Sequence, residues 1–198
     1  MATGHTDPRR RERILAAALD LIAEEGVAGV SHRKIAARAG VPLGSMTYHF
    51  TGIDELLLEV FTGYADHVVA VFERHLTDAA TQEEAREAVT DLIHTLSGGP
   101  RRDLILVQEL YTLAARREPY RALCVRWMSR SRALLETHFP SDTARQLDAL
   151  IEGLTLHRAL DDAPPDRSLT REAVRRITGA RPAALPLVAP PGADPGRA

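Results

Sequence analysis

The chain has 198 residues, of which 44% are apolar, and it contains a single cysteine. This composition can build a globular core, while one cysteine excludes an internal disulfide framework and favours a reducing cytoplasm. No segment approaches the roughly 18 apolar residues of a membrane-spanning helix, and no apolar stretch typical of a signal peptide follows the charged N-terminus. We therefore expect a cytoplasmic protein without a membrane span.

The net charge of −2 is unevenly distributed. The first 50 residues contain seven Arg or Lys against five Asp or Glu, so this part is positive and the remainder is negative. The N-terminal quarter is thus the part suited to a polyanion. No Cys/His cluster has the spacing of zinc ligands, and we expect neither a metal nor a cofactor.

Apolar residues recur at helical spacing along nearly the whole chain, and no period-two run appears, which predicts an all-α fold. The expected helices cover, in chain order, about 9–25, 32–39, 43–48, 54–76, 81–97, 101–117, 119–138, 141–160 and 169–178. The helix at 101–117 is apolar on most sides, which indicates a buried helix. Residues 180–198 are rich in Pro, Ala and Gly and are predicted to be a disordered tail.

The expected helix at 54–76 is long, and no flexible linker appears near its end. We therefore expect it to join an N-terminal unit, residues 8–68, to a C-terminal helical unit, residues 77–179. A shared helix would transmit motion from one unit to the other.

Residues 31–50 are predicted to form a helix-turn-helix, since two short helices are joined by a tight turn at Gly40. Ser31 is the expected N-cap of the first, yet three potential cations follow it, where the helix dipole disfavours positive charge. Beside free backbone N–H groups they would bind a phosphate; the alternative is that they are simply solvated. These residues are His32, Arg33 and Lys34.

The second helix of the pair is expected to turn small and polar side chains outward, where they suit the base edges of a major groove. Met46 and Phe50 are expected to point toward the core. The outward residues are Leu43, Gly44, Ser45, Thr47, Tyr48 and His49.

Residues 8 to about 68 resemble the DNA-binding domain of the TetR (tetracycline-repressor) family. The resemblance lies in the order helix, Gly, small cap, Arg-containing second helix, A-G-V turn and aromatic-His-Phe ending of RERILAAALDLIAEEGVAGVSHRKIAARAGVPLGSMTYHF. It implies a helical C-terminal part that binds a ligand and dimerises. It also implies DNA-backbone contacts from His32, Arg33, Tyr48 and His49, and groove contacts from Leu43, Gly44, Ser45 and Thr47.

Two positions depart from the family pattern. Thr47 stands where the recognition helix usually has Tyr, and Ile53 stands where the next helix usually begins with Lys. One customary phosphate contact is therefore missing, and more of the affinity is expected to come from Arg33, Lys34 and the N-terminal arginines.

In the C-terminal part, the helices at 101–117 and 119–138 combine apolar walls with a few polar groups, as small-molecule sites do. Residues at this spacing also commonly form core, and that alternative remains open. The candidate ligand residues are Gln108, Glu109, Tyr111, Thr112, Cys124, Trp127 and Met128.

One helix-turn-helix reads few base pairs, so a homodimer on a two-fold operator is expected. The helix at 141–160 carries apolar residues spaced for an interface, although the same face could pack within the subunit. The candidate interface residues are Leu147, Leu150, Ile151, Leu154 and His157.

The sequence favours one of three functions. The favoured one is a homodimeric transcriptional regulator, in the first place a repressor, that leaves double-stranded DNA when a small-molecule effector binds. The second is a DNA-binding protein that acts without a ligand and uses its C-terminal part only to dimerise. The third, an enzyme, finds no support, because no nucleophile with a paired base, phosphate loop or metal constellation is present.

Overall fold

A computed structural model describes residues 9–99, 101–161 and 166–179. The tail expected at 180–198 and the first residue of the N-terminal unit lie outside the described residues. The all-α prediction is confirmed, and within the described ranges no strand is present. The elements are α1 (Arg10–Glu25), a short 3-10 turn η1 (Val27–Gly29), α2 (His32–Ala39), α3 (Gly44–His49), α4 (Ile53–Leu76), α5 (Gln82–Ser97), α6 (Arg101–Ala114), α7 (Glu118–Glu136), α8 (Ser141–Leu160) and α9 (Arg167–Ile177).

Local side-chain and glycine signals define several helix ends. The Ser31 side chain accepts a hydrogen bond from the Lys34 backbone N–H at 3.4 Å and so caps α2. Gly40 ends the same helix with φ 63°, a left-handed conformation that glycine adopts without steric cost. At the start of α5, Thr81 and Glu84 form the reciprocal capping box that their spacing predicts.

Ser141 has the side chain of an N-cap residue at the start of α8, but it does not cap this helix. The N-cap is Pro140, and Ser141 is the first helical residue. Its hydroxyl donates a hydrogen bond to the Glu136 carboxylate at 2.7 Å, so it ties α8 to the end of α7 instead of satisfying a backbone donor of its own helix.

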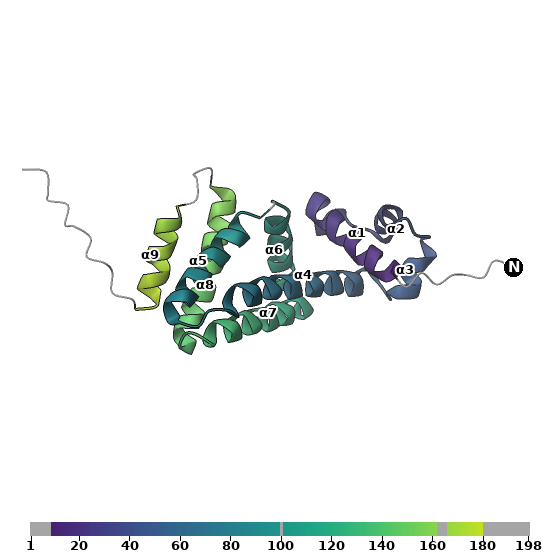
Figure 1. Cartoon of the computed structure of the whole chain (residues 1–198). Helices are drawn as coiled ribbons and strands as arrows, with labels where there is room; N and C mark the ends of the chain where they lie inside the picture. Colours follow the sequence, from purple (N-terminus) through teal and green to yellow (C-terminus); the bar gives the residue numbers. More distant parts are fainter. Residues whose placement is uncertain (1–8, 100, 162–165, 180–198) are drawn as a thin grey trace, which may run out of the picture.

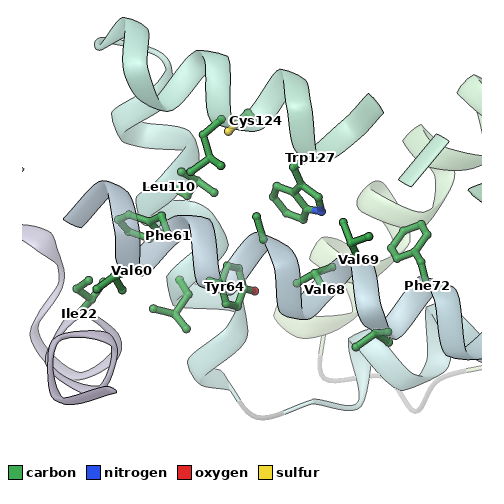
Figure 2. Packing of buried hydrophobic residues seen from close by; sticks show 14 of the residues in the cluster. Ile22, Val60, Phe61, Tyr64, Val68, Val69, Phe72, Leu110, Cys124 and Trp127 are labelled. Atoms are coloured by element: carbon green, nitrogen blue, oxygen red, sulfur yellow. The ribbon is translucent and has the colours of Figure 1, made fainter. Parts of the chain in front are cut away.

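The helices form two clusters along one shared axis, as Figure 1 shows: α1 to α3 lie at one end, and α4 runs from them into the larger cluster of α5 to α9. The 24 residues of α4 make it about 36 Å long. Its first half packs against α1, where Ile22 lies beside Val60, and its second half contributes Val68 and Phe72 to the C-terminal core (Figure 2). The shared helix expected from the sequence is thereby confirmed.

The expectation that α6 is buried on most sides is wrong. Only Leu106 and Leu110 are buried, while most of the remaining side chains are half-buried. The helix packs against α1 and α7, and a different face, carrying Leu104, Val107 and Tyr111, borders a cavity. An apolar helix that lines a cavity has the composition of a core helix without being enclosed on all sides.

Candidate nucleic-acid interface and small-molecule cavity

The first turn of α2 presents one exposed cation and one cation that is already paired. Arg33 is exposed and has no hydrogen-bond or ion-pair partner among the described residues. The Lys34 ammonium donates to the Gly29 carbonyl at 2.9 Å and pairs with the Glu25 carboxylate. The expectation of three cations without a protein partner is therefore wrong for Lys34, because the end of α1 and the following turn bring acceptors within its reach.

His32 differs from both neighbours. Its side chain is half-buried, and its Nε2 atom is buried without a hydrogen-bond partner. Farther along α2, Arg38 forms a two-point ion pair with Glu24 of α1, at 2.9 and 2.6 Å. The pairs made by Lys34 and Arg38 hold α2 against α1, which leaves Arg33 as the accessible charge of this first turn.

The second helix, α3, exposes most of the side chains expected to face outward. Tyr48 is 78% exposed, and its ring meets that of His49 edge to face at 4.9 Å. Leu43, Gly44 and Thr47 are also exposed. The Thr47 hydroxyl donates to the Gly44 carbonyl at 3.1 Å, which keeps this hydroxyl close to the helix axis.

The prediction that Ser45 faces outward is wrong, since its side chain is only 8% exposed. Met46 and Phe50 are buried as expected. Ser45 precedes Met46 by 100° around the helix, so it lies at the edge of the inward face, and α3 is too short for its apolar pattern to define that edge.

A cavity of about 510 Å³ lies in the C-terminal cluster, between α4, α6, α7, α8 and the end of α5. Its aromatic wall comes from three helices. Tyr111 stacks on Trp127 with ring centroids 6.1 Å apart, and Tyr64 meets the same indole edge to face at 6.5 Å. Figure 2 shows Trp127 projecting from α7 toward α4, the helix that carries Tyr64. Such a wall suits a flat aromatic ligand.

Two carboxyl groups of α8 face this aromatic wall. Burial raises the pKa of Glu152 above its usual range, an effect that a hydrogen bond from the Tyr111 hydroxyl partly offsets and the nearby Asp148 increases. Burial also raises the pKa of Asp148, although this carboxylate bonds to Arg132 at 2.7 Å. Glu152 is therefore a carboxyl of the cavity that has no ion-pair partner among the described residues, as is Asp103 at the start of α6.

The cavity includes three of the residues expected to bind ligand, namely Tyr111, Trp127 and Met128. The other four do not line it, so their assignment is corrected. On α6 the lining residues follow an i, i+3, i+7 stripe, and the polar residues that interrupt its apolar pattern lie off that stripe. Glu109 instead approaches Gly26 at the end of α1, Gln108 is half-buried, Thr112 is exposed and Cys124 is buried in the core.

Among the residues expected at a dimer interface, Leu147 and Ile151 are corrected, because both are buried within the subunit. They continue a stripe from Ala144 that faces α5 and α7. Leu150 and Leu154 are half-buried and His157 is exposed on the outer side of α8, so their interface role stays a prediction.

The sequence reasoning missed the polar stripe on the inner side of α8. Asp148, Glu152 and Thr155 lie at i, i+4 and i+7 and all line the cavity. That spacing was a usable signal, but the neighbouring leucines suggested an interface instead.

No group of three or more metal-ligating side chains occurs in the part of the chain that the structure describes. None of its helices is long and apolar enough to cross a membrane.

Comparison with known proteins identifies the family. Residues 14–60 match the family of bacterial regulatory proteins of the TetR type, and residues 80–180 match the tetracyclin repressor-like C-terminal domain. The chain belongs to the TetR family of bacterial transcriptional regulators. A search of the curated proteins found no match.

Solved structures resemble the chain over most of its length. SCO7518 from Streptomyces coelicolor A3(2), described as a transcriptional regulator, is 68% identical with a TM-score of 0.83, and the match covers 86% of this chain and 99% of that chain. The multidrug binding protein EbrR, solved with malachite green, is 32% identical with a TM-score of 0.74 and the same coverage. EbrR solved with ethidium is 35% identical with a TM-score of 0.70, again covering 86% and 99%.

Proposed function

We propose that this DNA-binding regulator is a cytoplasmic homodimeric repressor that leaves a two-fold operator when an aromatic organic cation enters the cavity. It acts by binding and not by catalysis. The observation that carries the proposal is the cavity itself, whose aromatic wall borders a half-buried carboxyl group, Glu152, without an ion-pair partner among the described residues.

The effector class follows from the lining. A flat cation between Tyr64, Tyr111 and Trp127 gains stacking and cation–π attraction, and the negative charge of ionised Glu152 compensates its own. The ligands of EbrR support this choice, because malachite green and ethidium are both aromatic cations.

Release from DNA requires the cavity to communicate with α1 to α3. On α4, Tyr64, Val68 and Phe72 line the cavity, and Leu56 and Val60 on the same helix are buried in the core that α1 shares. A ligand that favours a different inclination of α4 would therefore change the separation of the two recognition helices in a dimer. Only a difference in affinity between the two arrangements produces this shift.

A second connection runs through α6. The Tyr64 hydroxyl donates to the Asp103 carbonyl at 3.1 Å, and the preceding residue, Arg102, pairs with Asp20 of α1. Movement of the Tyr64 ring would thus displace the start of α6. Through the Arg102–Asp20 pair, this displacement would reach α1. Both connections start from Tyr64 and its neighbours in the aromatic wall. One ligand at this wall can therefore act on α4 and on α6.

The dimer is proposed through the outer face of α8 and the start of α9. Leu160 is 68% exposed and Leu169 is 67% exposed, and Leu150, Leu154 and His157 continue the face along α8. Large apolar side chains exposed together at the ends of two helices indicate a surface that a partner covers.

The function is tested by footprinting genomic fragments with the purified protein and then adding malachite green to the best-protected site. We expect a protected two-fold site at moderate salt, released by malachite green at concentrations that also quench the fluorescence of Trp127, the one tryptophan of the chain. A protein that protects no specific site would refute the regulator as an operator-binding dimer. Protection that persists at saturating dye would refute ligand release by this class.

Replacing Arg33 by alanine is expected to reduce the salt dependence of operator affinity. Each phosphate contact contributes about one to the slope of log Kd against log salt, and Arg33 is accessible for such a contact. Lys34→Ala is the matched comparison. Because Glu25 already neutralises Lys34, this variant should change the slope less than Arg33→Ala does, and it should lower the melting temperature because the ion pair is lost. Fluorescence anisotropy with the operator between about 50 and 200 mM salt measures both variants. An unchanged slope for Arg33→Ala would reject its phosphate contact.

A further inference from the structure

The cavity has a second polar region, on α8 beyond Glu152. Thr155 and Arg158 line the same cavity. The Thr155 hydroxyl and the Nη1 atom of Arg158 are buried, and neither has a hydrogen-bond partner among the described residues. Buried polar groups without a partner are rare, because each costs the free energy of its lost hydration. Three such atoms belong to residues that line this cavity, since the Ser131 hydroxyl of α7 is the third. Thr155 and Arg158 are three residues apart on α8, so one ligand group can satisfy both.

The guanidinium of Arg158 is held in place but incompletely neutralised. Its Nη2 atom donates to the backbone carbonyl of Asp166 at 3.1 Å and to the Thr170 hydroxyl, and neither acceptor is a full negative charge. The Asp166 carboxylate is itself engaged with Ser168. Burial lowers the pKa of Arg158, and the charge of Asp166 only partly opposes this.

His94 faces Arg158 from α5 and does not supply an anion. Its Nε2 atom lies 3.3 Å from the Thr170 hydroxyl, and burial together with the charge of Arg158 lowers its pKa, so it is neutral at physiological pH. Arg167, which also acts on His94, is paired with Asp91. An anionic oxygen bound at Nη1 of Arg158 would therefore supply the negative charge that this region lacks.

The two polar regions differ in sign and are well separated. Glu152 and Arg158 are six residues apart on α8, which corresponds to about 9 Å along the helix axis. The acidic region adjoins the stacked rings of Tyr111 and Trp127, and the basic region lies closer to the end of α8. A simple cation would satisfy Glu152 and leave Arg158 and Thr155 without a partner.

We propose that the effector is a zwitterion, with a flat aromatic cation against Tyr111, Trp127 and Glu152 and a carboxylate that accepts hydrogen bonds from Arg158 and Thr155. This inference rests on the proposed role of the cavity as the effector site. It narrows the effector from any aromatic cation to an amphoteric one.

A pair of dyes tests the carboxylate directly. Rhodamine 110 and rhodamine 123 share one cationic xanthene and differ in that the carboxylate of the first is a methyl ester in the second. The full-length protein is expected to bind rhodamine 110 about tenfold more tightly than rhodamine 123, which is the effect of one charge-assisted hydrogen bond. Dye anisotropy and the quenching of Trp127 fluorescence measure both affinities. Arg158→Gln should abolish this preference, and Thr155→Val should reduce it severalfold. The exposed control Arg126→Gln should leave it unchanged.

The outcomes separate this inference from the proposed function. Equal affinities for the two dyes, or tighter binding of the ester, would overturn the carboxylate site and leave the cationic effector standing. Binding of malachite green but of neither rhodamine would do the same, and failure of all three dyes would overturn both proposals. Should Arg158→Gln not fold, because it loses the contact with Thr170, the wild-type comparison and Thr155→Val decide.

Discussion

Replacing Glu152 by glutamine is expected to weaken the binding of malachite green by about ten- to a hundredfold, because the cation loses the buried carboxylate that compensates its charge. The same change should stabilise the free protein at neutral pH. Burial raises the pKa of Glu152 in the folded state. Ionisation of this group is therefore easier in the unfolded chain, and it costs stability as the pH rises.

The raised pKa of Glu152 defines the pH range in which the wild type and Glu152→Gln differ in stability. Below the ordinary pKa of a glutamate both states hold the proton, and the wild type and Glu152→Gln should have similar stability. As the pH rises through the raised folded-state pKa, the wild type loses stability that the glutamine variant keeps. Thermal melts from pH 4 to 8 should show a difference that grows to about 2–4 °C.

Glu73→Gln is the matched control, because Glu73 is an exposed glutamate of α4 outside the cavity. It should change neither dye affinity nor the pH dependence of melting. Dye affinity that survives Glu152→Gln would mean that another group compensates the cation, and Asp148 would be the next candidate. A variant less stable than the wild type at pH 8 would contradict the assigned direction of the pKa.

Introducing arginine at both Leu160 and Leu169 is expected to convert the proposed dimer into a monomer and to reduce operator affinity more than a hundredfold. Both side chains are exposed within the subunit, so the fold should tolerate the change. In the dimer the same positions would bury unpaired charges, which costs several kcal/mol. A monomer also presents only one recognition helix to a two-fold site.

Analytical ultracentrifugation and operator binding measure this result, and thermal melting verifies that the subunit remains folded. Val125→Arg is the control, because Val125 is an exposed apolar residue of α7, 57% exposed, on a helix outside the proposed interface. It should remain dimeric and bind the operator. A double variant that sediments as a dimer would place the interface elsewhere on the molecule.

The helices themselves were largely predictable, since their signals are local. The bounds of α2 agree with the prediction at both ends, because Ser31 and Gly40 act through hydrogen bonds within a few residues. Prediction failed where a residue could satisfy two roles. Ser141 had the chemistry of a cap but bonds to Glu136 on the preceding helix.

The exposed residues of the helix-turn-helix were predictable to a similar degree, and the cavity was not. The helix-turn-helix has a compact motif. Ser45 is buried, Lys34 is paired, and His32 and His49 are half-buried, while the other predicted residues are exposed as expected. The cavity draws on five helices, so no local pattern contains it. Tyr111, Trp127 and Met128 were found because aromatic and polarizable residues favour such sites, whereas Glu152 and Arg158 were not.

The sequence by itself determined the helices, several of their caps and the shared α4, because these depend on periodicity and on contacts between residues close in the chain. The TetR-type DNA-binding unit was identified by the resemblance of its motif. Only the tertiary structure decided which side of each helix meets which neighbour. An apolar stripe such as that of Leu147 and Ile151 must be buried, but its periodicity is the same whether α5, α7 or a second subunit covers it. For the same reason, the aromatic side chains of α4, α6 and α7 come to lie beside Glu152 of α8 only when the helices are assembled.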